Sequence, residues 1–595
     1  MKLVKIYTNN KPFHNIRFNP GFNVILGEPI ERKNKDKDTH NLGKSLLIDV
    51  LDFLLLKDIN RLPEHIFKKH KARFTGYVFY LEIKLNSGKH LVIRRGVDKL
   101  SKISFKLNPT ELAGFDEDLQ WDHENLPLEK AIEILDRYLA FDVVDPEWGF
   151  RKTISYFLRK QKDFLDVFQL SKYQGKHREW KPFLFDMLGF DGKRLLDKYD
   201  TDEKKKELLD LIAQVKEKFS IGTGESDKIK GIIDLKTDEK NKIEKKIDDF
   251  NFYLQDKEIN QKLVDETDSR IATLNTIRYN MTEEIKKIGE SMKTSVPRID
   301  TDELKRLYEE VEIFFPDNLV KEYKDLEVFN YRVSEERKKF MAERLAELND
   351  ELEPLEKELL GLETMKSELL SVLKDKDSYG KFKFYQKSLA KIDAEIARLD
   401  EKLANLDKVG ELETQIEKLN ETLKVQTEAI RELIARGNNF YTEIRRRFNQ
   451  FIQAVLNVPA IISIFQNRDG NIEFHADIQD PENLEVTAEG YGTTYKKFLC
   501  MAFDIAVLIT YSNRSFYRFV YHDGALEGLD NRKKVNFLNV VREICREYNL
   551  QYMLTVIDSD IPRDERENKI VFPDAEIVLR LHDRDDSGRL FEMSF

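Results

Sequence analysis

The sequence predicts an α/β domain assembled from the two ends of the chain, with a long antiparallel pair of coiled-coil helices inserted between its halves. Three features predict this fold class. A strand, a glycine-containing loop and a helix follow one another near the N-terminus, apolar residues recur with heptad spacing in the middle, and buried strands alternate with helices toward the C-terminus. We therefore expect the two halves at 1–192 and 451–595, and the coiled-coil hairpin at 193–450.

The composition agrees with long solvated helices joined to a globular part. The 595 residues exceed one compact domain, and 35% are charged against 41% hydrophobic, with only 25 Gly and 15 Pro. Two cysteines are too few for a disulfide framework or a zinc site, and no signal peptide or membrane-spanning apolar run is found, so we expect a cytoplasmic protein. The net charge of −10 restricts any nucleic-acid binding to local basic patches.

The first strand leads into a phosphate loop. An apolar run at 22–26 ends at Gly27, and Asn-Leu-Gly-Lys-Ser at 41–45 opens an amphipathic helix. Backbone N–H groups at such a helix start bind phosphate, the lysine reaches the β- and γ-phosphate oxygens, and the serine hydroxyl ligates Mg²⁺. The predicted ATP-binding residues are Gly27, Asn41, Leu42, Gly43, Lys44 and Ser45. A chance Gly-Lys-Ser sequence is the alternative.

The spacing of this loop is unusual. Gly27 and Gly43 are sixteen positions apart, whereas the usual motif places its two glycines about five positions apart. The extra residues, roughly 30–40, are charged and carry no apolar residue after Ile30. We expect them to form a solvated excursion of the loop at the mouth of the site.

Further strands and helices are predicted in both halves. In the N-terminal half we expect strands at 2–7, 13–18, 21–26, 77–85, 90–95 and 103–107, a helix at 128–139, and a basic helix at 151–161 that ends at Gln161. In the C-terminal half we expect strands at 460–465, 471–478, 516–522 and 552–557, and helices at 493–511 and 532–548. Since the first half lacks a carboxylate strand and the second lacks a phosphate loop, we expect both to close into one domain.

The middle of the chain predicts a helical hairpin. Leucine and isoleucine step by three and four residues through 345–362 and 389–406, and similar seams cover 243–254 and 281–292. Such seams need a partner helix, and Pro297 and the Phe-Phe-Pro sequence at 314–316 interrupt them. We expect an antiparallel hairpin that turns near 296–325, with kinks or folded-back segments absorbing its unequal arms. An ordinary helical bundle is the alternative.

A carboxylate follows the strand at 516–522. Asp523 stands where P-loop proteins hold Mg²⁺ beside the Ser/Thr hydroxyl, and Gly-Leu-Asp follows at 528–530. An aspartate at a strand end is by itself more often a cap or turn residue.

This order of motifs resembles the ATPases of the ABC class with coiled-coil insertions, of the SMC, RecN and double-strand-break-repair types. The inserted phosphate loop, His-Asp-Gly at 522–524 and Gly-Leu-Asp at 528–530 resemble more narrowly a bacterial group of short-coil SMC-like ATPases of unknown function with relatives in anti-phage defence loci. The resemblance covers the whole chain in architecture and only short motifs in sequence. It implies an ABC-type P-loop NTPase head that forms a homodimer around sandwiched ATP.

The resemblance also implies residue roles. Gln161 would sense the metal and the attacking water, Asp523 would be the Mg²⁺-side carboxylate, and Asp530 would belong to the loop between subunits. Gly492 and Thr493 lie where the family's signature turn presents N–H groups to the γ-phosphate of the opposite subunit. The predicted metal ligands are Ser45, Gln161 and Asp523.

Three positions depart from the family pattern. The glutamate that usually follows Asp523 is replaced by Gly524, although Glu527 or His522 could substitute. The usual histidine after the strand at 552–557 is replaced by Asp558 (or Asp560), and the signature turn lacks an adjacent Ser-Gly-Gly. We therefore expect an ATPase whose hydrolysis is slow or partner-dependent. The predicted catalytic residues are Gln161, Asp523, Glu527 and Asp558.

Basic clusters predict contact with double-stranded DNA through its phosphates, without sequence reading. The predicted contact residues are Lys71, Arg73, Arg151, Lys152, Arg159, Lys160, Arg445, Arg446 and Arg447. The alternative is a solvated helix face in a chain with 99 Lys and Arg residues.

The function we expect is that of an SMC-like ATPase whose heads dimerise around ATP and Mg²⁺. It would clamp DNA or control a partner effector, a nuclease or toxin, in anti-phage defence or DNA repair. The alternative is a catalytically weak scaffold that senses nucleotide and holds or releases that effector. A purely structural coiled coil would leave the apolar strands at 516–522 and 552–557 unexplained, and a transporter ATPase would not carry a coil this long.

Overall fold

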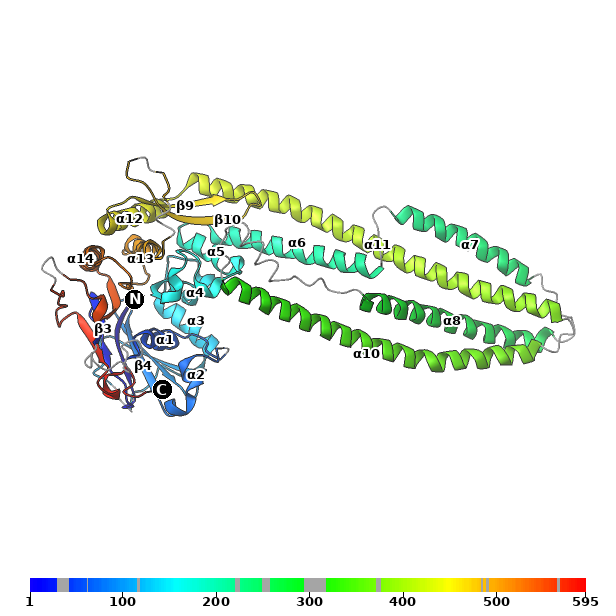
Figure 1. Ribbon diagram of the computed structural model, residues 1–595, viewed down its shortest axis with the longest axis horizontal. Helices are drawn as coiled ribbons and strands as arrows, with labels where there is room; N and C mark the ends of the chain where they lie inside the picture. The colour runs from blue at the N-terminus through cyan, green and yellow to red at the C-terminus, as the bar shows by residue number, and fades with distance from the viewer. Residues whose placement is uncertain are drawn as a thin grey trace. The chain divides into compact units, whose positions relative to one another are not determined.

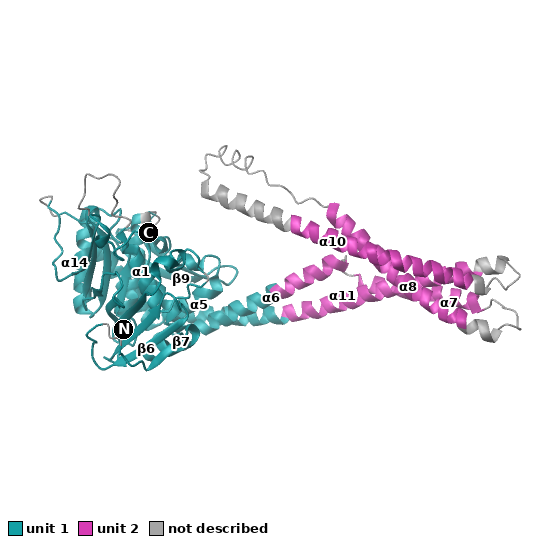
Figure 2. Cartoon of the chain, turned by 90° about the horizontal axis from the view of Figure 1, so that it is seen from below, with its two compact units in different colours: residues 1–206, 418–595 teal, residues 207–417 magenta. Residues whose placement is uncertain are grey.

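The computed structural model describes residues 1–28, 42–60, 62–114, 118–219, 225–248, 257–293, 317–370, 376–482, 485–487, 492–563 and 568–594 (Figure 1). Side chains are described for the same residues except 257–262, 317–334, 368–370, 376–381 and 493. The chain forms two compact units, one of residues 1–206 with 418–595 and the other of residues 207–417 (Figure 2). The first unit confirms that both ends of the chain build one α/β domain. The junctions expected near 193 and 450 lie inside it.

The first unit is built on a five-stranded parallel sheet with the order β13-β3-β12-β11-β8. Its strands are β3 (Phe22–Glu28), β8 (Leu158–Arg159), β11 (Phe519–His522), β12 (Gln551–Ile557) and β13 (Ile577–His582). All seven residues of β12 are buried, as expected for a central parallel strand that is covered on both faces. Because β3 lies between β12 and β13, the N-terminal phosphate-loop strand completes a sheet made mainly by the C-terminal half. The structure therefore confirms the predicted α/β head assembled from the two ends of the chain.

Helices join and cover these strands (Figure 1). They are α1 (Lys44–Leu54), α2 (Ile66–Lys69), α3 (Leu128–Leu139), α4 (Gly149–Phe157), α5 (His177–Met187), α12 (Asn439–Leu456), α13 (Thr493–Thr510) and α14 (Asn531–Glu547). Helix α13 is buried from Phe498 to Leu508, which its continuous apolar sequence predicts. The basic helix expected at 151–161 ends at Phe157, because Leu158 and Arg159 pair with β11 as strand β8. That part of the prediction was wrong.

A second, antiparallel sheet belongs to the N-terminal half and has the order β2-β1-β4-β5-β6-β7. Its strands are β1 (Lys2–Thr8), β2 (Ile16–Arg17), β4 (Val78–Lys84), β5 (His90–Gly96), β6 (Lys102–Asn108) and β7 (His123–Pro127). The predicted hairpin is formed by β4 and β5. A separate two-stranded sheet pairs β9 (Ala460–Gln466) with β10 (Ile472–Ile478).

The second unit consists of long helices. In chain order its helices are α6 (Gly192–Phe219), α7 (Ser226–Asp248), α8 (Lys257–Lys293), α10 (Asp317–Leu370) and α11 (Lys376–Arg436). The first part of α6 and the last part of α11 belong to the first unit. Ion pairs join α6 and α7 to α11 (Lys216–Glu413, Lys236–Glu395, Lys240–Asp393) and α8 to α10 (Arg270–Glu358, Arg344–Glu284). Within each set the partner's number falls as the residue number rises, so the arms are antiparallel, as predicted.

The coiled coil of the second unit is doubled over on itself (Figure 2). Helix α11 pairs with α7 through Asp393 and Glu395, and the same stretch contacts α8 through the Arg398–Glu283 ion pair at 3.6 Å. The α8–α10 pair therefore lies beside the α7–α11 pair. Of the turn expected at 296–325, residues 317–325 belong to α10 and the rest lies outside the described residues.

None of the helices in the described ranges is long and apolar enough to cross a membrane.

The sheet topology predicts how fragments of this protein behave. A fragment of residues 418–595 lacks β3, so β12 and β13 lose the strand between them and expose unpaired backbone groups. We expect this fragment alone to show no cooperative thermal unfolding by circular dichroism, and co-expression with residues 1–206 to restore a single transition. Cooperative unfolding of the isolated fragment would contradict the topology.

Candidate functional site

The carboxyl ends of the parallel strands meet at one edge of the sheet. In the strand register Gly27 of β3 lies beside Ile557 of β12, and His522 of β11 lies beside Leu554 of β12 and Arg159 of β8. The residues that follow these strand ends come from segments hundreds of positions apart. They include the phosphate loop, Asp523, Asp558 and Gln161, so the fold gathers most of the predicted site at this edge.

The end of the phosphate loop is held in a glycine-specific conformation. Gly43 has φ 96° and directly precedes α1, a left-handed backbone that glycine adopts without strain. A Cβ there would also lie 2.8 Å from Cβ of Leu590. The Leu590 N–H donates a hydrogen bond to the Leu42 carbonyl at 3.0 Å, so a segment from the far end of the chain fixes this loop.

Lys44 folds back across the end of β3. A Cβ built on Gly27 would lie 3.2 Å from Cδ and 3.3 Å from Nζ of Lys44. The absence of a side chain at Gly27 therefore lets the buried lysine place its ammonium over the strand end, where a phosphate chain would enter. Ser45 is exposed in the first turn of α1, the part of a helix that favours an anion. Asn41 and the inserted residues 30–40 lie outside the described residues.

Asp523 is fixed by a threonine on the neighbouring strand. The Thr555 hydroxyl donates to Asp523 Oδ1 at 2.8 Å and accepts from the Gly524 N–H at 2.8 Å. Asp523 is only 4% exposed, and the Tyr521 hydroxyl at the same strand end donates to the Lys44 carbonyl at 3.4 Å. The carboxylate is thereby held rigidly in the strand edge that faces α1.

A hydroxyl and a carboxylate suit Mg²⁺, which is commonly bound through one or two protein oxygens with substrate phosphates and waters. Ser45 and Asp523 are such donors. Within the described part of the chain, no cluster of three or more His, Cys, Asp or Glu side chains forms a metal site. Ser45 and Asp523 therefore fit an ion whose coordination is completed by a nucleotide.

Gln161 and Glu527 meet beside Gly524. Gln161 Nε2 donates to both carboxylate oxygens of Glu527 at 2.7 Å. Lys497 of α13 donates to the carbonyls of Gly524 and Glu527 at 3.0 and 3.1 Å. Two of the predicted catalytic residues are thus brought together, and a lysine that the sequence did not single out braces the turn that carries one of them.

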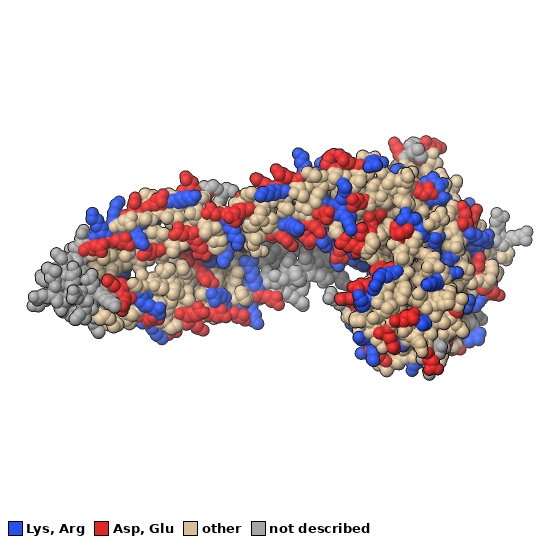
Figure 3. All heavy atoms as spheres, turned by 180° about the vertical axis from the view of Figure 1, so that it is seen from behind, with Lys and Arg blue, Asp and Glu red and all other residues tan. Residues whose placement is uncertain are grey.

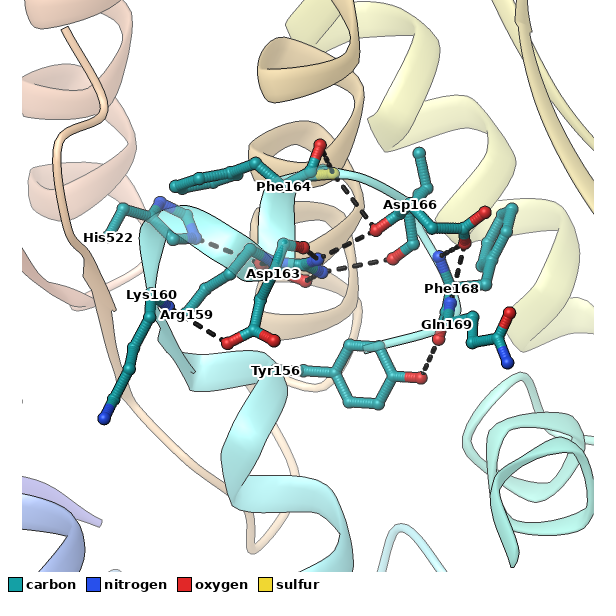
Figure 4. Close-up of polar contacts among 12 residues, drawn as sticks. Tyr156, Arg159, Lys160, Asp163, Phe164, Asp166, Phe168, Gln169 and His522 are labelled. Carbon is teal, nitrogen blue, oxygen red and sulfur yellow. Dashed lines mark hydrogen bonds and ion pairs between the residues drawn. The ribbon is translucent and has the colours of Figure 1, made fainter. Parts of the chain in front are cut away.

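A buried network lies beneath this edge of the sheet (Figure 4). Arg159 donates to Asp504 through Nε and Nη2 at 2.7 Å, and His522 Nε2 lies 3.0 Å from the same carboxylate. His522 Nδ1 lies 2.7 Å from the Tyr552 hydroxyl. Burial lowers the pKa of His522 below its usual value, although Asp504 opposes this shift. His522 is fully buried with both ring nitrogens engaged, so it is not available as the base that replaces the missing glutamate.

The same network corrects the prediction that Arg159 contacts nucleic acid. Its guanidinium is 0% exposed and also donates to the carbonyls of Asp163, Asp166 and Val167. Sequence showed only a basic segment, because the acidic partner lies 345 positions away.

Several other predicted DNA contacts are occupied within the protein. Arg151 donates to Asp52 at 2.8 Å, Lys160 pairs with Asp49, and Lys152 lies 4.7 Å over the Trp148 ring. Arg446 and Arg447 both form ion pairs with Glu443 of the same helix. Lys71, Arg73, Arg445 and Arg446 remain exposed. On the face shown in Figure 3, acidic and basic side chains are interspersed and form no continuous basic stripe.

The remaining predicted residues occupy structural positions. Asp530 caps α14 by accepting from the Arg532 N–H at 3.0 Å, and Gly492 precedes α13. The side chain of Thr493 lies outside the described residues. Asp558 pairs with Lys569 at 2.5 Å.

Sequence reasoning missed three supporting residues: Thr555, Lys497 and Asp504. Asp504 carried a usable signal, since a single carboxylate inside the apolar helix 493–511 needs a buried partner. Thr555 and Lys497 carried none, because their partners are backbone groups or lie on distant segments.

Comparison with known proteins gives distant relatives of unassigned function. Residues 451–595 match a family described as an uncharacterised protein conserved in bacteria (DUF2326). The chain is 21% identical to the uncharacterized protein YydD of Bacillus subtilis (strain 168), over 97% of this chain and 96% of that protein.

Solved structures with some likeness include the Smc head domain with a coiled coil and joint from Pyrococcus yayanosii, at 15% identity over 93% of this chain and 92% of that chain, with a TM-score of 0.34. The Smc head domain with an extended coiled coil from Pyrococcus furiosus, bound to the C-terminal domain of ScpA, has 13% identity over 94% and 90% and a TM-score of 0.35. The recombination mediator protein RecF with ATP has 10% identity over 94% and 92% and a TM-score of 0.25. At these low TM-scores the fold assignment rests on the strand order described above.

The buried network predicts a large stability effect at Asp504. Asp504→Ala leaves the Arg159 charge buried without its partner, so we expect a loss of about 3–5 kcal/mol of unfolding free energy. Chemical denaturation followed by circular dichroism measures it. Glu133→Ala, which removes the exposed ion pair with Lys130, is the control and should unfold like the wild type. Equal stability of Asp504→Ala and wild type would contradict the structural role of the network.

Proposed function

We propose that this protein binds ATP with Mg²⁺ at the phosphate loop and hydrolyses it slowly or with the help of a partner. The observation that carries the proposal is the Lys44 ammonium folded over Gly27, 3.3 Å from where a Cβ would be. A buried lysine at a helix start, packed over a glycine near the end of a strand, fits the phosphates of a nucleoside triphosphate. Asp523, held by Thr555 at the end of β11, supplies the carboxylate that such a site needs.

Ser45 and Asp523 are the residues that would hold the ion. The chemistry that Mg²⁺ would supply there is neutralisation of the negative charge on the phosphates. Lys44 would hold the same phosphates from the other side, and the N–H groups at the start of α1 would add further donors. Asp558 has no catalytic role in this proposal, because Lys569 forms an ion pair with its carboxylate.

We further propose that two heads form a homodimer around the nucleotide. The turn at Gly492 and Thr493 lies at the N-terminus of α13, where N–H groups can receive a phosphate presented by a second copy. Asp530, which caps α14, would belong to the loop between subunits. Nucleotide-dependent dimerisation would let the protein clamp double-stranded DNA or control a partner effector, a nuclease or toxin, in anti-phage defence or DNA repair. The candidate DNA contacts are the exposed residues Lys71, Arg73, Arg445 and Arg446.

A second candidate function is a nucleotide-sensing scaffold with little turnover, which holds or releases its effector according to the bound nucleotide. Gly524, in place of the usual glutamate, and the Asp558–Lys569 ion pair favour it. A brisk DNA-stimulated ATPase rate from the purified protein alone would argue against this candidate.

Lys44→Ala tests the primary proposal. Because a hydrogen bond to a charged group contributes ~1.5–3 kcal/mol, we expect ATP affinity to weaken by about 10- to 150-fold. Equilibrium binding of a fluorescent ATP analogue measures the affinity, and light scattering during gel filtration measures ATP-dependent dimerisation. Lys89→Ala, an exposed lysine in the β4–β5 turn, is the control. Unchanged ATP binding and dimerisation of Lys44→Ala would refute the proposed site.

A further inference from the structure

We infer that Glu527 is the catalytic carboxylate that activates water for attack on the γ-phosphate, delivered to the place left by Gly524 from three residues farther along the chain. This inference rests on the proposed ATPase function and names the residue that accepts the proton of the attacking water.

The backbone at Gly524 makes room for this carboxylate. Gly524 has φ +66°, a left-handed conformation, and a Cβ built there would lie 2.9 Å from Glu527 Oε1 and 2.7 Å from Gln161 Nε2. Real Cβ atoms are not found so close to other heavy atoms. The Glu527 carboxylate and the Gln161 amide therefore fill the space in which a side chain at position 524 would begin.

The turn that carries Glu527 is closed and braced. The Glu527 N–H donates to the Gly524 carbonyl at 3.2 Å, so the chain reverses within four residues and returns the side chain toward Gly524. Lys497 donates from α13 to the carbonyls at both ends of this turn. Gly528, with φ +72°, then leads the chain away toward α14.

The carboxylate itself is oriented from a third segment. Gln161 Nε2 donates to both of its oxygens at 2.7 Å, and Gln161 follows directly on β8 and Lys160. Gln161 thus holds the side chain of Glu527, and Lys497 holds the backbone of the turn that carries it. A glutamate that was merely solvated would not need contacts of both kinds.

Glu527 also lies next to the proposed magnesium site. Gly524 directly follows Asp523, and the hydroxyl of Thr555 bonds both the Gly524 N–H and the Asp523 carboxylate at 2.8 Å. The Glu527 carboxylate therefore lies against Gly524, the residue that directly follows the carboxylate expected to face the metal. His522 is the other nearby residue that could accept a proton. It is buried, and both of its ring nitrogens are hydrogen-bonded.

The step assigned to Glu527 is the hydrolysis of the terminal phosphoryl group. The water oxygen forms a bond to the γ-phosphorus, and the bond from that phosphorus to the β–γ bridging oxygen breaks, with its electron pair leaving on ADP. Glu527 accepts the proton that the water gives up, and the products are ADP and inorganic phosphate.

The test compares the full-length wild type with Glu527→Gln, measuring ATP affinity by equilibrium binding and phosphate release with Mg²⁺ present. Positioned proton acceptors contribute about 10²–10⁴-fold to a rate, so we expect phosphate release to fall at least about 100-fold while ATP affinity stays within about twofold. Glu543→Gln, an exposed glutamate on α14, is the matched control and should keep the wild-type rate. Gly524→Ala should lower phosphate release in the same way, because its methyl group displaces Glu527 and Gln161.

The outcomes separate this inference from the proposed function. Wild-type protein that fails to bind ATP refutes the proposed function itself. Wild-type protein that binds ATP but releases phosphate no faster than Lys44→Ala overturns the assignment of Glu527, as does a Glu527→Gln variant with the wild-type rate. A Glu527→Gln variant that melts at the wild-type temperature yet loses ATP binding also overturns it, because Glu527 would then act in binding.

Discussion

The position of β3 between β12 and β13 is the constraint from which the rest of the structure follows. A strand from residues 22–28 pairs with strands from residues 551–557 and 577–582, so the part of the intervening chain that forms the second unit, residues 207–417, must leave the head and return to it. Two antiparallel helical arms satisfy that requirement with local hydrogen bonds alone. The same pairing places Gly27 in register with Ile557, so the phosphate loop and the acidic strand ends face each other because of the closure.

Regular patterns allowed much of the fold to be predicted from sequence. Heptad spacing predicted the antiparallel arms, continuous apolar runs predicted β11 and β12, and Gly-Lys-Ser predicted the start of α1. The missed strands β8 and β13 are short or lie at the sheet edges. Strand β8 has only two residues, and its pairing with β11 carries no local signature, so the sequence pattern predicts the end of a helix there.

The candidate site was predictable only in part, because its contacts join residues far apart in sequence. Lys44 and Asp523 were found from local motifs. The Gln161–Glu527 contact spans 366 positions and the Arg159–Asp504 ion pair spans 345, and neither alters the sequence pattern around its members. The same reason explains the wrong prediction that Arg159 contacts DNA: without its buried acidic partner, a basic residue is expected on the surface.

The geometry at Gly524 has a consequence for how this sequence can change. A glutamate at position 524 would need a Cβ where Gln161 Nε2 and Glu527 Oε1 already lie, on a backbone in the left-handed region that disfavours it. Restoring the usual adjacent glutamate would thus require the backbone, Gln161 and Glu527 to change together, and each single substitution would disturb the site before the next could repair it. The effect of a substitution at 524 therefore depends on the residue at 527, and we expect Gly524 and Glu527 to be inherited together.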